Sequence, residues 1–199
     1  MREWVEETFP NFLRNFHDEY PDNLIELWFQ DETRFGQKTK ISRVWSEIGS
    51  RRTAVNQNGF TCAYLFGAVN VFTGKHVGFL VPECNSEMMN IHLSLISKEI
   101  AVNSHVALVV DGAGWHQGSG LQIPNNISLL SLPPYSPELN PVERLWLWLK
   151  QNHLCNTTYK DMNAILDAGV HAWQALTDDI VKSVCSVTYA TCGRPFSIW

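Results

Sequence analysis

Two short runs of bulky apolar residues, each followed by an acidic residue, most constrain how this chain can fold. The first, residues 24–30, reads LIELWFQ and precedes Asp31, and the second, residues 105–110, reads HVALVV and precedes Asp111. Runs of this length without polar alternation are typical of strands buried on both faces, as in the middle of a parallel or mixed sheet. Because ligands of open α/β sheets gather at the carboxyl ends of the strands, we expect both acids to end strands at one edge of the sheet.

The rest of the chain carries further strand and helix patterns. Residues 61–70 and 75–81 predict a hairpin around Thr73-Gly74, and residues 41–45 and 127–132 predict two more strands. Apolar residues recur at helical spacing in residues 1–20, 86–102 and 159–176. No apolar run has the length needed to cross a membrane. These elements, within 199 residues, predict one α/β domain with helices packed on a mixed sheet.

A third acidic residue, Glu143, lies where a proline-rich loop becomes a helix. Residues 132–148 read LPPYSPELNPVERLWLW, in which Asn140 suits the N-cap and Pro141 the first helical position. Glu143 then falls in the first turn of a helix with an apolar body. Two interpretations remain open: a functional carboxylate, or a capping box in which Glu143 folds back onto the Asn140 N–H.

Three acids in these positions predict a site for hard divalent cations, which take oxygen ligands and are held by a few carboxylates. Two such ions about 4 Å apart can assist in-line phosphoryl transfer. Taken singly, a strand-end Asp is usually a turn or cap residue. Glu32 competes with Asp31 for the role, and Glu138 competes with Glu143.

The charge of the chain is acidic overall but unevenly distributed. Its net charge is −5, which argues mildly against nucleic-acid binding, since phosphate contacts need Lys and Arg. A basic cluster nevertheless follows the first acid, made of Arg34, Lys38, Lys40, Arg43, Arg51 and Arg52. It fits either a solvated face or an arm that contacts a phosphate backbone. The five cysteines form no C-x-x-C pair, so a reducing cytoplasm is the expected compartment.

Three motifs together resemble the catalytic domain of DDE transposases, in the mariner-like superfamily and its bacterial insertion-sequence branch. They are FQDET at 29–33, VVDGAGWH at 109–116 and PPYSPELNPVERLW at 133–146, and RVWSEIG at 43–49 is also similar. The resemblance covers residues 24–155 and implies an RNase H-like fold. It implies a catalytic, metal-binding triad of Asp31, Asp111 and Glu143, although the 31 residues between the last two are slightly fewer than usual.

The resemblance also implies a function. Such proteins use Mg²⁺, with Mn²⁺ as a substitute and two ions expected, to cut DNA at transposon ends and transfer the strand into target DNA. DNA is then the expected partner, and the full-length protein is expected to be a homodimer. The expected location is the cytoplasm of a bacterium, at the nucleoid. His116 and Tyr135 become candidate DNA contacts, against the simpler alternatives of a hydrogen-bonded histidine and turn packing.

The same resemblance predicts a division of the chain into two parts, and alternative functions remain open. Residues 1–23 are expected to be a helical connector and residues 24–199 the catalytic domain, with no room for the usual N-terminal helix-turn-helix domains. A catalytically decayed DNA-binding or scaffold domain is the alternative function. A metal-independent hydrolase with a carboxylate pair, such as a glycosidase, is a third.

Overall fold

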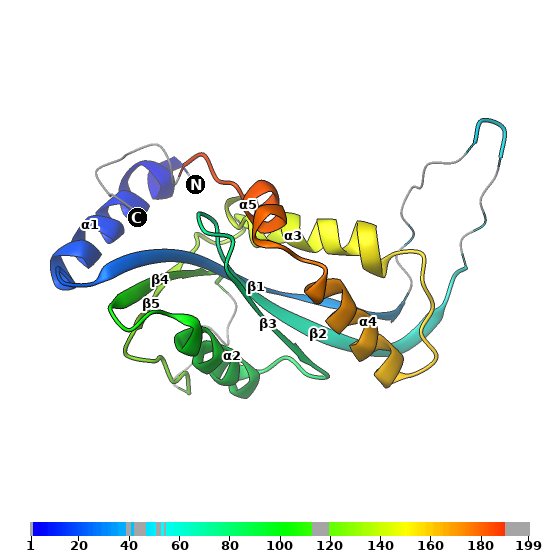
Figure 1. The fold of residues 1–199 in the computed structure, drawn as a ribbon. Coiled ribbons are helices and arrows are strands. Elements are labelled where there is room, and N and C mark those ends of the chain that lie inside the picture. Colours follow the sequence, from blue (N-terminus) through cyan, green and yellow to red (C-terminus); the bar gives the residue numbers. More distant parts are fainter. Residues whose placement is uncertain are drawn as a thin grey trace.

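The computed structural model describes residues 2–38, 41, 47–50, 53, 55–112 and 120–189. In this part of the chain, five strands form one mixed sheet in the order β3-β2-β1-β4-β5 (Figure 1). The strands are β1 (Leu24–Lys38), β2 (Asn58–Asn70), β3 (His76–Val81), β4 (Ser104–Val110) and β5 (Ile127–Ser131). β1, β2 and β3 pair antiparallel, whereas β4 runs parallel to both β1 and β5. The predicted mixed sheet is confirmed.

Helices cover both faces of this sheet (Figure 1). The α-helices are α1 (Phe9–Glu19), α2 (Ser86–Glu99), α3 (Val142–Leu149), α4 (Met162–Gln174) and α5 (Asp178–Val184). The π-helical turn η1 (Trp4–Thr8) precedes α1, η4 (Lys150–Leu154) continues α3, and the 3₁₀ turn η3 (Pro137–Leu139) precedes it. None of the helices in the described ranges is long and apolar enough to span a membrane.

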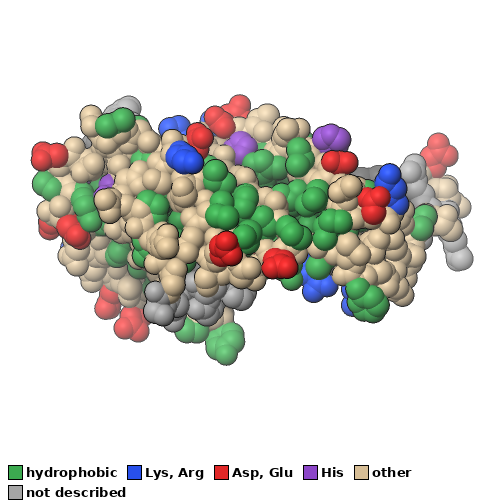
Figure 2. All heavy atoms as spheres, turned by 90° about the horizontal axis from the view of Figure 1, so that it is seen from below, with side chains coloured by type: hydrophobic (Ala, Val, Ile, Leu, Met, Phe, Trp, Pro, Cys, Tyr) green, Lys and Arg blue, Asp and Glu red, His purple; other side chains and the backbone are tan. Residues whose placement is uncertain are grey.

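The central strand β1 is buried on both sides because each face of the sheet has its own hydrophobic core. Leu27 and Phe29 belong to the core beneath α1, α3, α4 and α5, while Trp28 belongs to the core beneath α2. Trp28 and Phe29 are both completely buried. The α2 face is shown in Figure 2, where apolar side chains remain visible among acidic ones. The unbroken apolar run of β1 thus reflects burial from two sides.

Most of the predicted elements are present, with shifted ends. The helices expected at 1–20, 86–102 and 159–176 and the hairpin turning at Gly74 are confirmed. α4 begins at Met162 because the Asp161 side chain accepts a hydrogen bond from the Ala164 N–H at 2.8 Å. The seven-residue helix α5 was not predicted, being too short to show a clear periodicity. The strand expected at 41–45 falls, apart from Ile41, outside the described ranges.

Candidate active site

Asp31 lies inside β1, and the prediction that it ends the strand was wrong. β1 continues to Lys38 because β2 pairs with it through Gly36↔Cys62 and, after a register shift, again at Lys38↔Asn58. The parallel pairing of β1 with β4, however, stops at Phe29↔Val109. Alternation along the strand puts Asp31 on the same face as Phe29, and it is only 6% exposed. Asp31 is therefore a buried acid just beyond the end of the parallel pairing.

Two glycines make room for two indole rings, one of which contacts Asp31. Asp31 pairs with Gly67 of β2, and Gly67 with Gly78 of β3, so the three residues form one row across the sheet. A Cβ atom at Gly67 would lie 2.5 Å from Cη2 of Trp146, and one at Gly78 would lie 2.4 Å from Cε2 of Trp173. Trp146 donates its Nε1–H to Oδ2 of Asp31 at 2.8 Å. Trp146 is buried as predicted, but its bond to Asp31 was not foreseen.

Replacing Gly67 by Ala is expected to destabilise the protein by about 1–3 kcal/mol, as overpacking of a filled core does. The added methyl group would overlap the Trp146 ring, so the indole must shift and its bond to Asp31 weaken. Urea unfolding of the variant measures the effect. Gly120→Ala is the matched control, because a Cβ atom there meets nothing within 4 Å. Equal stability of the two variants would contradict the packing argument.

The environment of Asp31 strongly disfavours its charged form. Burial, followed by the negative charges of Glu143 and Glu32, raises the pKa of Asp31 from 3.8 to about 8. The hydrogen bonds from Trp146 and from the Glu32 backbone act in the opposite direction and only partly offset this rise. In the absence of a cation, Asp31 is therefore largely protonated near neutral pH.

The start of α3 is tied to the strand that carries Asp31. Asn140 donates its Nδ2–H to the carbonyl oxygen of Gln30 at 3.1 Å, and its Oδ1 accepts from the Val142 N–H at 3.2 Å. The Asn140 N–H donates to the carbonyl of Pro137 at 2.9 Å, so the alternative capping box with Glu143 is not formed. Glu143 is exposed, and it lies three residues before Trp146, on the same side of α3. Asn140 thus fixes the third acid relative to the first.

Asp111 directly follows the last residue of β4, as predicted. It stands two residues beyond Val109, as Asp31 stands two residues beyond Phe29, so the register places both at the same level of adjacent strands. Burial raises the pKa of the Cys84 thiol to about 11, and the charges of Glu32 and then Asp111 add to the rise. Glu32 acts on both Asp31 and Cys84, which makes it a fourth carboxylate at this edge.

The acids fit a divalent cation by their chemistry and shared location. As the side chains stand, no group of three His, Cys, Asp or Glu within the described part of the chain is placed to hold a metal ion. A buried carboxylate among like charges is nevertheless the group whose ionised form a cation would favour. Asp31, Asp111 and Glu143 would supply oxygen ligands, and a cation would have to draw them together.

Only some of the residues predicted to contact DNA lie in the part of the chain that the structure describes. Arg34 and Lys38 are exposed near the end of β1. Tyr135 is fully exposed in the loop before α3 and has a φ angle of 57°, which is uncommon for a residue other than glycine. The other candidates lie outside the described ranges; they are Lys40, Arg43, Arg51, Arg52 and His116.

The five-stranded mixed sheet with helices on both faces defines an RNase H-like fold. A family model described as DDE superfamily endonuclease matches residues 26–166. The chain therefore belongs to this family, in agreement with the resemblance to mariner-like DDE transposases.

Two sequence relatives and one solved structure are similar to the chain. The uncharacterized protein y4pE/y4sA of Sinorhizobium fredii is 43% identical over 116 residues, which are 58% of this chain and 86% of that protein. An uncharacterized 39 kDa protein of insertion element IS630 from Shigella sonnei is 27% identical over 148 residues, 67% of this chain and 41% of that protein. The crystal structure of the Mos1 mariner paired end complex with Mn has a TM-score of 0.62 at 14% identity, over 88% of this chain and 55% of that chain. The chain thus spans about half the length of the IS630 and Mos1 proteins.

Proposed function

We propose that this chain is the catalytic domain of a transposase that cuts DNA at the ends of a mobile element and joins them to target DNA. The observation that carries the proposal is Asp31, a buried carboxyl with a pKa of about 8 beside the charges of Glu143 and Glu32. The ionised form of such a carboxyl is unfavourable unless a cation binds, and cation-bound carboxylates at this edge suit phosphodiester chemistry. The likeness to an insertion-element protein and to a mariner complex supports DNA as the substrate.

In this mechanism Asp31, Asp111 and Glu143 would hold two Mg²⁺ ions, with Mn²⁺ as a substitute. Bound ions of this kind lower the pKa of an attacking water or 3′-hydroxyl and stabilise the leaving oxygen. Asp31 anchors the site because it is buried and held by Trp146. Glu143 is exposed on the first turn of α3, where it can close the ligand set when DNA arrives. Catalysis then depends on positioning and charge neutralisation, without a covalent protein intermediate.

The whole protein is proposed to act as a dimer on the paired ends of its element, within the bacterial nucleoid. The Mos1 structure is a paired end complex, and the chain covers only about half of it. Recognition of the end sequences would belong to other parts of such a protein, which agrees with the net charge of −5 in this chain.

Calorimetric titration with Mn²⁺ tests the proposal. We expect binding to the wild-type chain at pH 7.5, with release of protons, because Asp31 must ionise to bind the cation. Asp31→Asn and Asp111→Asn should each weaken binding at least tenfold. Asp167→Asn, which removes an exposed carboxyl on α4, is the matched control and should bind like the wild type.

Cleavage separates an active domain from a decayed one. An active domain should nick plasmid DNA in Mg²⁺ or Mn²⁺, and EDTA should stop the reaction. Mn²⁺ binding that does not depend on Asp111, together with absence of nicking, would indicate the decayed scaffold instead. Hydrolysis that persists in EDTA would contradict a metal-dependent site.

A further inference from the structure

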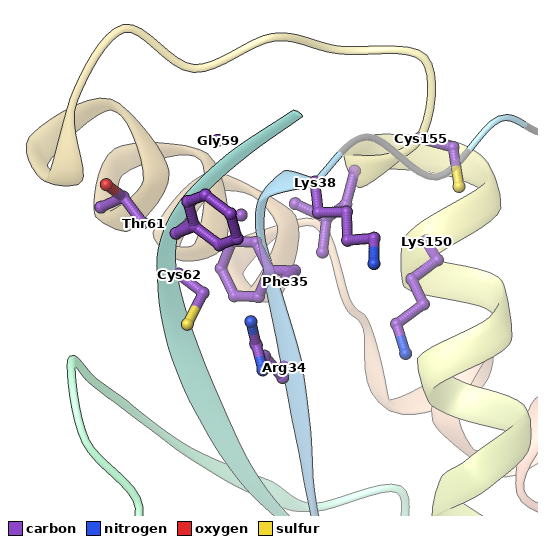
Figure 3. A pocket seen from close by; sticks show the side chains of 11 residues that line it. Arg34, Phe35, Lys38, Gly59, Thr61, Cys62, Lys150 and Cys155 are labelled. Atoms are coloured by element: carbon purple, nitrogen blue, oxygen red, sulfur yellow. The ribbon is translucent and has the colours of Figure 1, made fainter. Parts of the chain in front are cut away.

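A cavity of about 360 Å³ opens where the far end of the β1–β2 pair meets the helix that follows Glu143. β1 and β2 form one side of it, and η4 with the residue after it forms the other (Figure 3). The lining residues are Arg34, Phe35, Gly36, Lys38, Gly59, Phe60, Thr61, Cys62, Lys150, Leu154 and Cys155. A Cβ atom at Gly36 would lie 2.4 Å from the Thr61 carbonyl oxygen, so glycine is needed for the two strands to approach here.

Every charged residue among those lining this cavity is basic. Arg34, Lys38 and Lys150 are its charged members, in a chain where acidic residues outnumber basic ones by 20 to 15. Figure 3 shows Lys38 and Lys150 projecting from the strand and the helix into the space between them. Within the described ranges, Arg34 and Lys38 form no ion pair with an acidic side chain. The cavity is therefore a local concentration of positive charge suited to an anion.

The cavity also contains a surface on which a planar group can stack. Phe60 lines it and is 93% exposed, although a phenylalanine at the end of a strand would normally be covered. Exposed aromatic rings beside cationic side chains are the combination that holds single-stranded nucleic acid, with bases stacked on the ring and phosphates near the cations. The surroundings thus favour a nucleic-acid strand over a small inorganic anion.

Arg34 and Lys38 follow Asp31 along β1, and Lys150 follows Glu143 along the helix. Arg34 follows Asp31 by three residues on β1, which is about 10 Å of strand. Lys150 follows Glu143 by seven residues on the continuous helix of α3 and η4, also about 10 Å and close to two turns, so both lie on one side of that helix. Successive phosphates of one DNA strand are about 3.4 Å apart along the axis, so 10 Å corresponds to about three nucleotides.

We propose that the Arg34–Lys38–Lys150 cavity binds a backbone phosphate of the DNA strand about three nucleotides from the bond that is cut, with a neighbouring base against Phe60. This assignment rests on the proposed function, because the three acids define where the cut bond lies. Arg34 and Lys38 were already predicted to contact DNA. The assignment adds Lys150 of the helix, the aromatic ring of Phe60 and a defined position along the DNA strand.

DNA binding in EDTA tests the charge of the cavity independently of catalysis. The variants are Arg34→Ala, Lys150→Ala and the pair combined, and Lys98→Ala, which removes an exposed lysine from α2, is the matched control. We expect the double variant to bind a fluorescent DNA at least tenfold more weakly and its log–log salt slope to fall by about one, since one phosphate contact contributes about 0.9. Lys98→Ala should leave both quantities unchanged. An unchanged slope in a folded double variant would overturn the proposal.

A scan of neutral phosphates tests the position. A duplex that the wild-type chain cuts is prepared with one methylphosphonate at each of the six nucleotides on either side of the cut bond. The substitution about three nucleotides away should weaken wild-type binding but have no further effect on the double variant. A further effect in the double variant, or a sensitive position elsewhere, would overturn the assigned position. If the wild type cuts no DNA while the salt slope still falls, the proposed catalytic function fails and the cavity remains a phosphate site.

Discussion

Asp31→Asn is expected to abolish DNA cleavage, by at least about a thousandfold, while making the metal-free protein more stable. Loss of activity follows because an amide cannot replace the carboxylate that we propose anchors the cation. The gain in stability follows from burial, since Asp31 is 6% exposed and its pKa is raised to about 8. Asparagine keeps an acceptor for the Trp146 N–H without the charge. Activity and stability of the metal-free fold therefore change in opposite directions at this position.

The stability gain has a defined pH dependence. The pKa of Asp31 is higher in the folded chain than in the unfolded chain, so the folded state holds the extra proton between about pH 4 and pH 8. Stability of the wild type consequently falls as pH rises through this range, an effect of several kcal/mol when complete. The difference between Asp31→Asn and wild type should grow from pH 4 to pH 8 and then level off.

Urea unfolding at several pH values in EDTA, alongside nicking in Mg²⁺, measures both effects. Addition of Mg²⁺ should stabilise the wild type at pH 7.5 and leave Asp31→Asn unchanged, because only the native cation site gains by binding. Asp167→Asn serves as the control for both measurements. Nicking by purified Asp31→Asn in Mg²⁺ would show that the assignment of Asp31 is wrong.

Trp146→Phe is expected to raise the pKa of Asp31 further. In a plot of cleavage rate against pH, the rise in rate on the acidic side should therefore move to higher pH. The Trp146 N–H is a hydrogen bond that lowers this pKa, and phenylalanine removes the donor but keeps much of the ring. Less of the Asp31 carboxylate is then available to a cation at neutral pH. Trp146→Ala should in addition lose about 3–5 kcal/mol of stability, as truncation of a buried tryptophan does.

The pH dependence of cleavage separates this positioning role from simple packing. Trp148→Phe is the control, because Trp148 lies on the same helix, is half-buried and has its ring 5.3 Å from that of His153. Only Trp146→Phe should shift the profile, and the lost rate should return as the pH is raised. A uniform loss of rate at every pH would indicate that Trp146 acts through packing alone.

The secondary structure was largely predictable because its signals are local. The apolar runs of β1 and β4, the turn at Gly74 and the helical spacing in α2 and α4 each lie within a few residues of sequence. The end of β1 was missed because it depends on pairing with β2, some 30 residues further along the chain. Asp31 was expected at a strand end for the same reason.

The sequence by itself determined the family and most of the helices and strands, and it predicted the three acids as the site, since motifs and periodicity are properties of neighbouring residues. Only the tertiary structure decided how the site is held. It pairs Asp31 with Gly67 so that Trp146 can lie over the glycine and donate to the acid, and it ties Asn140 to the Gln30 carbonyl. It also brings Lys150 beside Arg34 and Lys38 around one cavity. These contacts join residues 36 to 116 positions apart, and no local pattern records which distant side chains will meet across a packed sheet.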